Sequence, residues 1–163
     1  MDSGLASVQQ RFVEGMGEIS RFWGFSPVMG RMYGLLYLSE EPLTADAISE
    51  ALTISKGNVS MNLRNLDRWG MMRKTRKKGD RKEYYEAEPN FVKIFVNILL
   101  ERRNREFDRS LGTVTGCLQQ TKGIAMGKEA VFVRKRLLHM ERFFKTLDAS
   151  VMTLLKLVGK RAQ

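Results

Sequence analysis

The chain has 163 residues, enough for one or two small domains, and its contents of 43% hydrophobic and 28% charged residues are typical of a folded globular protein. Its single cysteine, Cys117, excludes a disulfide framework within the chain, and neither a signal peptide nor an apolar run long enough to span a membrane is visible, so a cytoplasmic protein is expected. The formal net charge of +10 predicts a polyanionic partner, either a nucleic acid or an anionic membrane surface.

Two helices are expected in the first 39 residues. Residues 4–23 carry apolar side chains at helical spacing, and Gly24 ends this stretch. Ser26 and Pro27 then supply the N-cap and the first-turn proline of a second helix that runs to about Ser39. The apolar positions of the first helix are Leu5, Val8, Phe12, Met16, Ile19 and Trp23, and those of the second are Met29, Met32, Tyr33, Leu36 and Tyr37.

The next segment has the order helix, turn, helix. Thr44 is a good N-cap for a third helix, and Ser55 caps a fourth helix that Gly70 ends after Trp69. Because a helix turns by about 100° per residue, the apolar stripe of the fourth helix leaves an opposite face of short polar and basic side chains, which suits a helix lying close to base edges. The apolar positions are Ala47, Ile48, Ala51 and Leu52 in the third helix, and Val59, Leu63 and Leu66 in the fourth.

The outward face and the N-terminus of the fourth helix form a candidate reading surface for DNA. The free N–H groups and Lys56 would meet a phosphate, and Arg68 would contact the backbone further along. Arginine pairs well with guanine and asparagine with adenine, and Met61 offers an apolar contact to a thymine methyl group. For each single residue, plain solvation on a helix surface is the alternative. The candidates are Ser55, Lys56, Asn58, Ser60, Met61, Arg64, Asn65 and Arg68.

Two short β-like runs, Met71 to Arg76 and Lys82 to Ala87, flank turn chemistry at Gly79 and Asp80. This pattern predicts a hairpin, or wing, whose basic side chains contact the DNA backbone or enter the minor groove. Ten basic and two acidic residues lie between Lys56 and Lys82, so most of the net charge of +10 is in this segment. The wing candidates are Arg76, Lys77, Lys78, Arg81 and Lys82.

The remainder of the chain predicts two long helices. Asn90 can cap a fifth helix from Phe91 to about Gln120, and a last helix runs from about Lys128 to Val158 with an unbroken heptad seam. We expect dimerisation through this seam, because a helix-turn-helix normally acts as a two-fold dimer, and a bundle within the chain is the alternative. The seam comprises Val133, Leu137, Met140, Phe144, Leu147, Val151, Leu154 and Val158.

The expected fold class is therefore mainly α with a small β-wing, a winged helix-turn-helix with long N- and C-terminal dimerisation helices. We expect an N-terminal helix that contributes to dimerisation over residues 1–25, a DNA-binding domain over residues 26–89, and a helical dimerisation region over residues 90–163.

Catalytic chemistry is not indicated. One histidine, His139, and one cysteine cannot supply a convincing metal cluster, and no nucleophile elbow is present. We therefore expect no enzyme, no cofactor and no metal site. Cys117 is expected to be a small buried apolar residue, with redox sensing as the alternative.

The first 90 residues resemble the MarR-type winged helix-turn-helix transcriptional regulators, and within them the GbsR-like branch. The resemblance is carried by the run FWGFSPVMGRMYGLLYLS at 22–39, the reader ISKGNVSMNLRNL at 54–66, the pair Trp69-Gly70 and the wing KGDRK at 78–82. It implies a homodimer joined by helices from both chain ends, and transcriptional repression relieved by a small molecule. The family's usual wing has one residue between its Asp and Arg, whereas Asp80 and Arg81 are adjacent here, which bears on the minor-groove role of Arg81.

Members of this branch include regulators of choline and glycine-betaine genes, so the resemblance suggests a quaternary ammonium effector held in an aromatic box. The effector candidates are Trp23, Phe25, Tyr33 and Tyr37, for which packing in the core is the alternative.

These observations predict a dimeric, sequence-specific DNA-binding transcriptional regulator, a repressor released by a small-molecule effector. The alternative is an architectural protein that binds double-stranded DNA through charge without choosing a sequence. A membrane partner is not expected, because no helix pairs a lysine-rich face with a bulky apolar one strongly enough.

Overall fold

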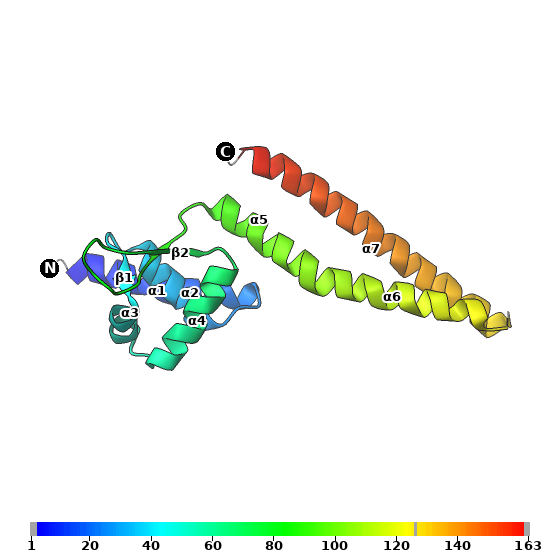
Figure 1. The fold of residues 1–163 in the computed structure, drawn as a ribbon, viewed down its shortest axis with the longest axis horizontal. Coiled ribbons are helices and arrows are strands. Elements are labelled where there is room, and N and C mark those ends of the chain that lie inside the picture. The colour runs from blue at the N-terminus through cyan, green and yellow to red at the C-terminus, as the bar shows by residue number, and fades with distance from the viewer. Residues whose placement is uncertain (1–2, 126, 162–163) are drawn as a thin grey trace. The chain divides into compact units, whose positions relative to one another are not determined.

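The computed structural model describes residues 3–125 and 127–161, and the chain divides between Ile94 and Phe95 into two compact units (Figure 1). The outermost ends of the predicted ranges 1–25 and 90–163 lie outside the described residues. The division of the chain into three functional parts stays a prediction, and α1 belongs to the same unit as the helix-turn-helix.

The first unit packs helices around a small antiparallel sheet (Figure 1). Its strands are ordered β1-β3-β2, with Thr44 opposite Tyr84 and Met72 opposite Ala87. The wing strands are shorter than the sequence predicted, because residues 76–83 form an open loop instead of extending the ladder. The elements are α1 (Ser3–Phe22), α2 (Pro27–Tyr37), β1 (Leu43–Thr44), α3 (Ala45–Leu52), α4 (Lys56–Arg68), β2 (Met72–Thr75) and β3 (Tyr84–Ala87), after which α5 (Phe91–Arg102) begins.

Side-chain caps set the starts of the helices, as the sequence predicted. The hydroxyls of Ser26, Thr44 and Ser55 each accept a hydrogen bond from the backbone N–H three residues later, at 3.1–3.2 Å. Such a cap satisfies one of the N–H groups that a helix start leaves unpaired. The side-chain amide oxygen of Asn90 does the same for α5, accepting from the N–H of Lys93 at 3.0 Å.

Close approach of α1 and α2 depends on a glycine. A Cβ atom added to Gly30 would lie 2.2 Å from the carbonyl oxygen of Met16 and 2.6 Å from the hydroxyl of Ser20, so no other residue fits without moving α1. On the side of α1 that faces α2, Val13 and Ser20 are buried. The other side of α1 stays open, with four large apolar side chains that are 51–85% exposed, namely Leu5, Val8, Ile19 and Phe22.

The core of the first unit is mostly the one expected. Met29, Met32, Tyr33 and Leu36 of α2 are at most 3% exposed, while Tyr37 is only half-buried. In α3, Ile48 is fully buried, whereas Ala47 and Leu52 are half-buried. The prediction was wrong for Ala51, which is exposed, because the eight residues of α3 bury a narrower face than the pattern suggested.

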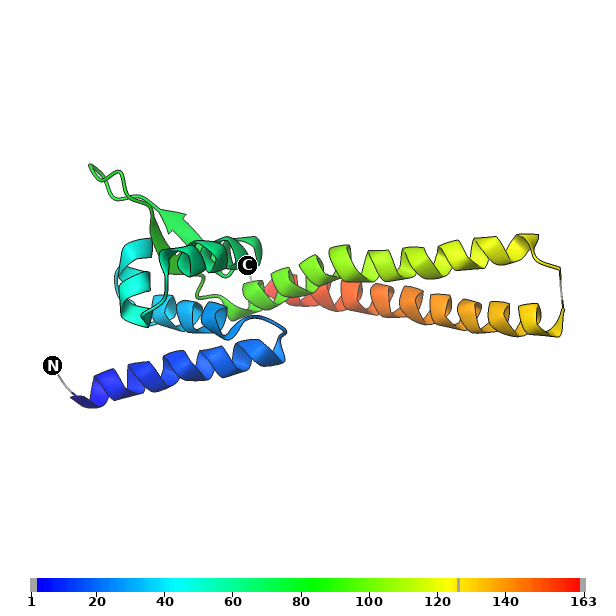
Figure 2. The ribbon, with the colours of Figure 1, turned by 90° about the horizontal axis from the view of Figure 1, so that it is seen from below.

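The second unit is built from long helices. The fifth helix predicted from Phe91 to Gln120 is one continuous helical path, but it has three parts: α5, a π-helical turn over Arg103–Phe107, and α6 (Asp108–Gln120). A short 3₁₀ turn, Thr121–Gly123, ends it, and α7 (Lys128–Arg161) runs back antiparallel beside α6 (Figures 1 and 2). A π turn inserts one extra residue into a helix and shifts the faces on either side of it.

Of the eight residues of the heptad seam predicted on α7, four are half-buried and four are exposed. Leu137, Phe144, Val151 and Val158 are half-buried, as expected for residues that pack within a helical hairpin. The other four positions, Val133, Met140, Leu147 and Leu154, are 40–50% exposed. The structure therefore gives these four residues no complete partner surface within the described chain. Leu155, which is not one of the eight seam positions, is 6% exposed and belongs to the buried face.

The predicted fold class is confirmed, a mainly α chain with a small β-wing and long terminal helices. Cys117, expected to be buried, is exposed on α6 and His139 is exposed on α7. Over the described part of the chain, no helix has the length and apolarity to cross a membrane. The described residues also include no group of three or more His, Cys, Asp or Glu side chains placed to hold a metal ion.

Candidate nucleic-acid interface

The helix α4 is held by an apolar stripe that matches the sequence prediction. Val59 and Leu66 are fully buried and Leu63 is 5% exposed, so the opposite face must point away from the unit. Gly70, with a φ of 64°, lets the chain turn sharply after the C-cap residue Trp69. One end of α4 is thus fixed by the Ser55 cap and the other by this left-handed residue.

The DNA-binding candidates on α4 fall into two groups. Asn58 and Asn65 are half-buried and flank the stripe. Met61 is 51% exposed, and the guanidinium of Arg64 donates to the hydroxyl of Ser60 at 3.4 Å across one helical turn. The candidates that lie exposed are Ser55, Lys56, Ser60, Met61, Arg64 and Arg68. The structure therefore brings the predicted polar and basic residues together on one outward face.

Two of the cations on α4 already have partners within the unit. The ammonium of Lys56 lies 2.7 Å from the carboxylate of Asp46 on α3, and this contact lowers the pKa of Asp46 and raises that of Lys56. The guanidinium of Arg68 lies 5.7 Å from the ring centroid of Trp69. A phosphate that binds Lys56 must compete with Asp46, although both side chains are well exposed.

A buried amide, which the sequence analysis did not single out, connects α4 to α2. Asn62 is 1% exposed, and its Oδ1 accepts from the hydroxyl of Ser26 at 2.9 Å. Its Nδ2 donates to the backbone oxygen of Asn58 at 2.9 Å and to the side-chain oxygen of Asn58 at 2.7 Å. The cap residue of α2 thus reaches a candidate base-reading residue through one buried side chain.

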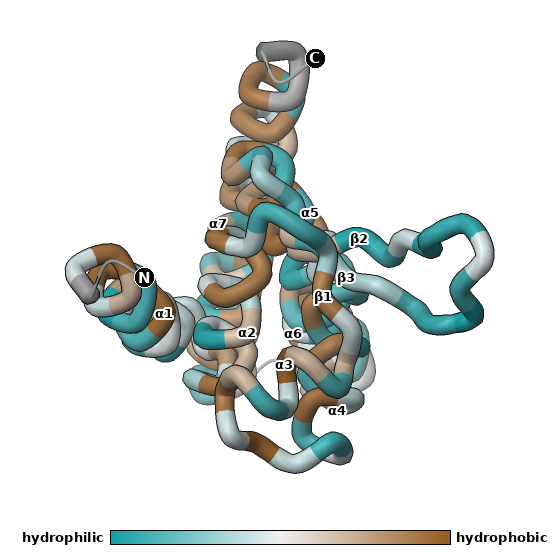
Figure 3. Tube along the Cα trace, turned by 90° about the vertical axis from the view of Figure 1, so that its left-hand side faces the viewer, coloured by the Kyte–Doolittle hydropathy of each residue, from teal (hydrophilic) through white to brown (hydrophobic). Residues whose placement is uncertain are grey.

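The loop of the wing, residues 76–83, projects from the first unit and is hydrophilic along most of its length (Figures 2 and 3). Gly79 has a φ of 85° in this turn. The carboxylate of Asp80 accepts from the hydroxyl of Tyr84 at 2.7 Å and from the N–H of Lys82 at 2.9 Å, and these two bonds lower its pKa. The ammonium of Lys77 lies 5.0 Å from the ring centroid of Tyr84. Asp80 and Tyr84 together give the loop a defined shape.

All five basic wing candidates are exposed, but they differ in their contacts. Arg76 lies 3.9 Å from Glu83, and Lys77 lies 3.1 Å from Glu41. The remaining three, at the tip and on the return of the loop, are Lys78, Arg81 and Lys82. The carboxylate of Asp80, directly before Arg81, accepts both of its hydrogen bonds from within the wing.

A second site missed by the sequence analysis lies where the wing meets α5. Glu88 is 3% exposed; its carboxylate accepts from Lys93 at 2.7 Å, from the N–H of Asn90 at 3.1 Å and from Arg73 at 3.2 Å. Burial alone would raise the pKa of Glu88, but these three donors together lower it below its ordinary value. The backbone oxygen of Glu88 also accepts from the hydroxyl of Tyr33 at 2.9 Å. Glu88 thus ties together β2, α2 and the start of α5.

Two of the four effector candidates precede α2 and two lie within it. Tyr33 is 1% exposed and stacks on Tyr37 at 5.9 Å, and burial, followed by the charges of Tyr37 and Glu88, raises the pKa of its hydroxyl. Trp23 and Phe25 precede α2, where Phe25 makes an edge contact with Trp69 at 4.9 Å. Tyr33 is therefore a core residue, and an effector role for the four residues stays a prediction.

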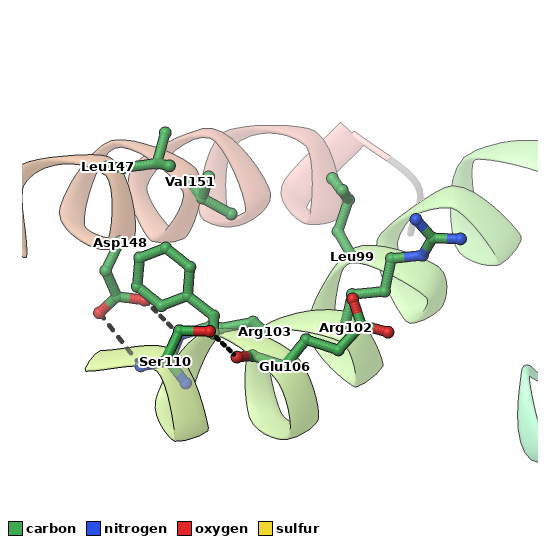
Figure 4. Close-up of a pocket in the computed structure, with 9 residues that line it drawn as sticks. Leu99, Arg102, Arg103, Glu106, Ser110, Leu147, Asp148 and Val151 are labelled. Atoms are coloured by element: carbon green, nitrogen blue, oxygen red, sulfur yellow. Dashed lines mark hydrogen bonds and ion pairs between the residues drawn. The ribbon is translucent and has the colours of Figure 1, made fainter. Parts of the chain in front are cut away.

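A hollow of about 280 Å³ lies within the second unit, beside the π-helical turn (Figure 4). The guanidinium of Arg103 pairs with both carboxylate oxygens of Asp148, at 2.5 and 3.2 Å, which joins the π turn to α7. The other side chains that line it are Leu99, Arg102, Glu106, Phe107, Ser110, Leu147 and Val151. The heptad pattern included Leu147 and Val151 but gave no signal for this hollow.

Comparisons with known proteins agree with the helix-turn-helix geometry. The chain is similar to the HTH-type transcriptional repressor GbsR of Bacillus subtilis (strain 168), at 30% identity over 94 residues that cover 58% of this chain and 52% of that protein. It is also similar to the HTH-type transcriptional repressor OpcR of the same organism, at 27% identity over 90 residues, 55% of this chain and 49% of that protein. No model of a known protein family matches the chain.

The resemblance to MarR-type regulators of the GbsR-like branch is confirmed by these relatives, of whose length the chain spans about half. A crystal structure described as a transcriptional regulator has the same fold, with a TM-score of 0.68 and 23% identity over 93% of this chain and 98% of that one. The fold, including the long terminal helices, is thereby supported over nearly the whole chain.

Proposed function

We propose that the chain is a cytoplasmic, homodimeric, sequence-specific DNA-binding transcriptional regulator, a repressor that a small molecule releases from its operator. The observation that carries the proposal is the outward face of α4, where Ser60, Met61 and Arg64 are exposed beside a projecting basic loop. A helix of this kind enters the major groove, while the loop follows the backbone or the minor groove. Names of relatives as HTH-type repressors support the same reading.

The dimer is part of this proposal. The exposed positions of the α7 seam, Val133, Met140, Leu147 and Leu154, form a row spaced by seven residues, which suits contact with a second helix. The open side of α1 adds further apolar surface that a partner can cover. Two copies of the reading helix would then address two half-sites related by a two-fold axis.

The proposal is tested by selecting bound duplexes from a random pool with the purified protein. We expect a palindromic motif with half-sites centred about 10 base pairs apart. Binding without any enriched motif would instead identify an architectural protein that holds DNA through charge alone. Failure to retain duplex DNA at low salt would overturn both assignments, because a basic surface of this size must bind nucleic acid there.

Two arginine variants separate base reading from backbone contact. Arg64→Ala should cost roughly 1–3 kcal/mol of binding free energy on the selected site and relax the preference at one base pair. Arg81→Ala should weaken binding to all sequences and reduce the slope of log affinity against log salt by about 0.9. Fluorescence anisotropy titrations at several salt concentrations measure both quantities, and unchanged binding in both variants would contradict the docking of α4 and the wing.

The effector is the remaining part of the proposal. By resemblance, the candidate is a quaternary ammonium compound, held over aromatic faces near Trp23 and Phe25. Titration calorimetry with choline and glycine betaine, in the presence and absence of the selected duplex, tests it. A small molecule that releases the protein from DNA must bind the free protein more tightly than the DNA complex, because each ligand weakens the binding of the other by the same factor.

A further inference from the structure

The buried amide of Asn62 has only one orientation that satisfies its neighbours. The backbone oxygen of Asn58 can only accept hydrogen bonds, so the group 2.9 Å from it must be the NH₂ of Asn62. The oxygen of Asn62 then faces the hydroxyl of Ser26, which donates to it at 2.9 Å and in turn accepts from the N–H of Met29. A reversed amide would set two carbonyl oxygens against each other.

This orientation dictates how Asn58 is turned. The second N–H of Asn62 points at the side chain of Asn58 at 2.7 Å, so the atom that receives it is the side-chain oxygen of Asn58. The inward side of the Asn58 amide is therefore its acceptor. Asn58 is half-buried, and its NH₂ group, with two donors, lies on the side of the amide turned away from Asn62.

We infer that Asn58 is a donor-only base reader whose target in the operator is a guanine, with Asn62 as the residue that positions it. The inference rests on the proposed DNA-binding function and specifies one contact of the reading surface. Asn58 is the third residue of α4 and lies in its first turn, the part of a recognition helix that reaches base edges.

The choice of guanine follows from the pattern of groups in the major groove. Adenine is read by asparagine through a pair of bonds, in which the side-chain oxygen accepts from N6 and the NH₂ donates to N7. That pair of bonds needs the side-chain oxygen of Asn58, which is turned inward and accepts from Asn62. Guanine presents two acceptors, N7 and O6, and is the base that two outward donors match best. The sequence-based expectation of an adenine contact therefore does not extend to Asn58.

The test uses the selected duplex with each guanine of a half-site replaced in turn by 7-deazaguanine, which lacks the N7 acceptor. At one guanine, the wild-type protein should lose roughly fivefold to tenfold in affinity, the equivalent of one hydrogen bond. Asn58→Ala should bind the unmodified site more weakly and show no further loss with the modified base at that position. Asn65→Ala, a matched change two turns along the same helix, should keep the full sensitivity to that base.

Asn62→Asp tests the positioning role. An aspartate can only accept, so Asn58 should turn its NH₂ inward and present its oxygen to the groove. A repeated selection should then show, at that one position, a change from guanine to a base with an exposed amino group, adenine or cytosine. Circular dichroism and thermal unfolding show whether the variant is folded. If it is not, the comparison of wild type and Asn58→Ala on the normal and the 7-deazaguanine duplex tests the contact of Asn58 alone.

The outcomes separate the inference from the function on which it rests. A protein that selects an operator but is insensitive to 7-deazaguanine, or whose Asn58→Ala variant remains equally sensitive at every guanine, overturns the inference and leaves the regulator intact. A dependence on the N6 group of an adenine that Asn58→Ala removes also overturns it. A protein that selects no sequence fails the proposed function, and the inference falls with it.

Discussion

The helices α4 and α7 were both predicted from a regular apolar pattern, yet the pattern had different outcomes in the two. On α4, the predicted residues Val59, Leu63 and Leu66 are at most 5% exposed. On α7, an equally regular seam leaves Met140 and Leu154 about half exposed. Periodicity therefore identifies the apolar face of a helix, but whether that face is buried depends on which surface covers it.

Neighbouring elements of the same unit cover the stripe on α4, so one chain is enough to complete it. The outer row of the α7 seam faces no such surface in the described chain. An unbroken heptad repeat that a single chain buries only in part is typical of a helix that pairs with a second copy. Three substitutions test how burial stabilises these regions.

The largest effect is expected from Leu154→Glu on α7. Leu154 is 50% exposed, so the change should leave the folded monomer intact. In a dimer it would place a charge in an apolar contact, which should weaken association at least 100-fold, or about 3 kcal/mol. Sedimentation equilibrium at micromolar concentrations measures the change, and DNA binding should weaken in parallel.

Ala149→Glu is the matched control for this variant. Ala149 is exposed and lies five residues earlier on α7, about 140° around the helix axis from Leu154. It receives the same charge on the same helix but outside the seam, so the dimer should persist. Equal dissociation constants for the two variants would show that the exposed row is not the dimer contact.

How much of the molecule the sequence predicts depends on how local the signal is. The caps at Ser26, Thr44 and Ser55 are set by residues three positions apart, and all three were predicted. The network around Asn62 joins residues 36 positions apart, and the hydroxyl of Tyr33 reaches a carbonyl 55 positions away. No spacing rule points to such partners, because they meet only when the unit folds.

The same reason explains the individual errors. Cys117 is apolar enough for a core, but it lies on the exposed side of α6, and no pattern near it fixes which side is covered. The π-helical turn over Arg103–Phe107 also changes which residues of the long helix face α7, and the spacing of apolar residues does not predict this turn. The candidate reading surface was predictable because capping and one clear stripe fix the rotation of α4.

Glu88→Gln removes a negative charge that the first unit buries together with its hydrogen-bond donors. Its removal should lower the free energy of unfolding by about 1–3 kcal/mol at pH 7, since bonds from Lys93 and Arg73 to a charged group are lost. The pKa of Glu88 is lower in the folded state than its ordinary value of 4.5. Its stabilisation is therefore present above pH 4.5 and is lost as the pH falls through the lowered value.

Urea unfolding at pH 7 and at pH 3.5 measures this effect. The difference in stability between the two proteins should be large at pH 7 and smaller at pH 3.5, because Glu88 of the unfolded wild-type chain takes up its proton near its ordinary pKa of 4.5. Glu50→Gln, on the exposed side of α3, is the control and should change stability by less than about 0.5 kcal/mol. A constant difference between Glu88→Gln and the wild type at both pH values would contradict the proposed role of the charge.

The smallest effect, and the only gain, is expected from Thr53→Gly in the turn between α3 and α4. Thr53 is the C-cap of α3 and has a φ of 52° and a ψ of 47°, a left-handed conformation that β-branched residues adopt only under strain. Its side chain is exposed, so little packing is lost with it, and glycine should raise the free energy of unfolding by about 1 kcal/mol. Ala51→Gly, at an exposed position of α3 itself, should lower it by a similar amount, because there glycine only loosens a helix. Opposite signs two residues apart would show that the left-handed conformation of Thr53 is strained. A loss of stability in both variants would mean that the left-handed conformation costs Thr53 nothing.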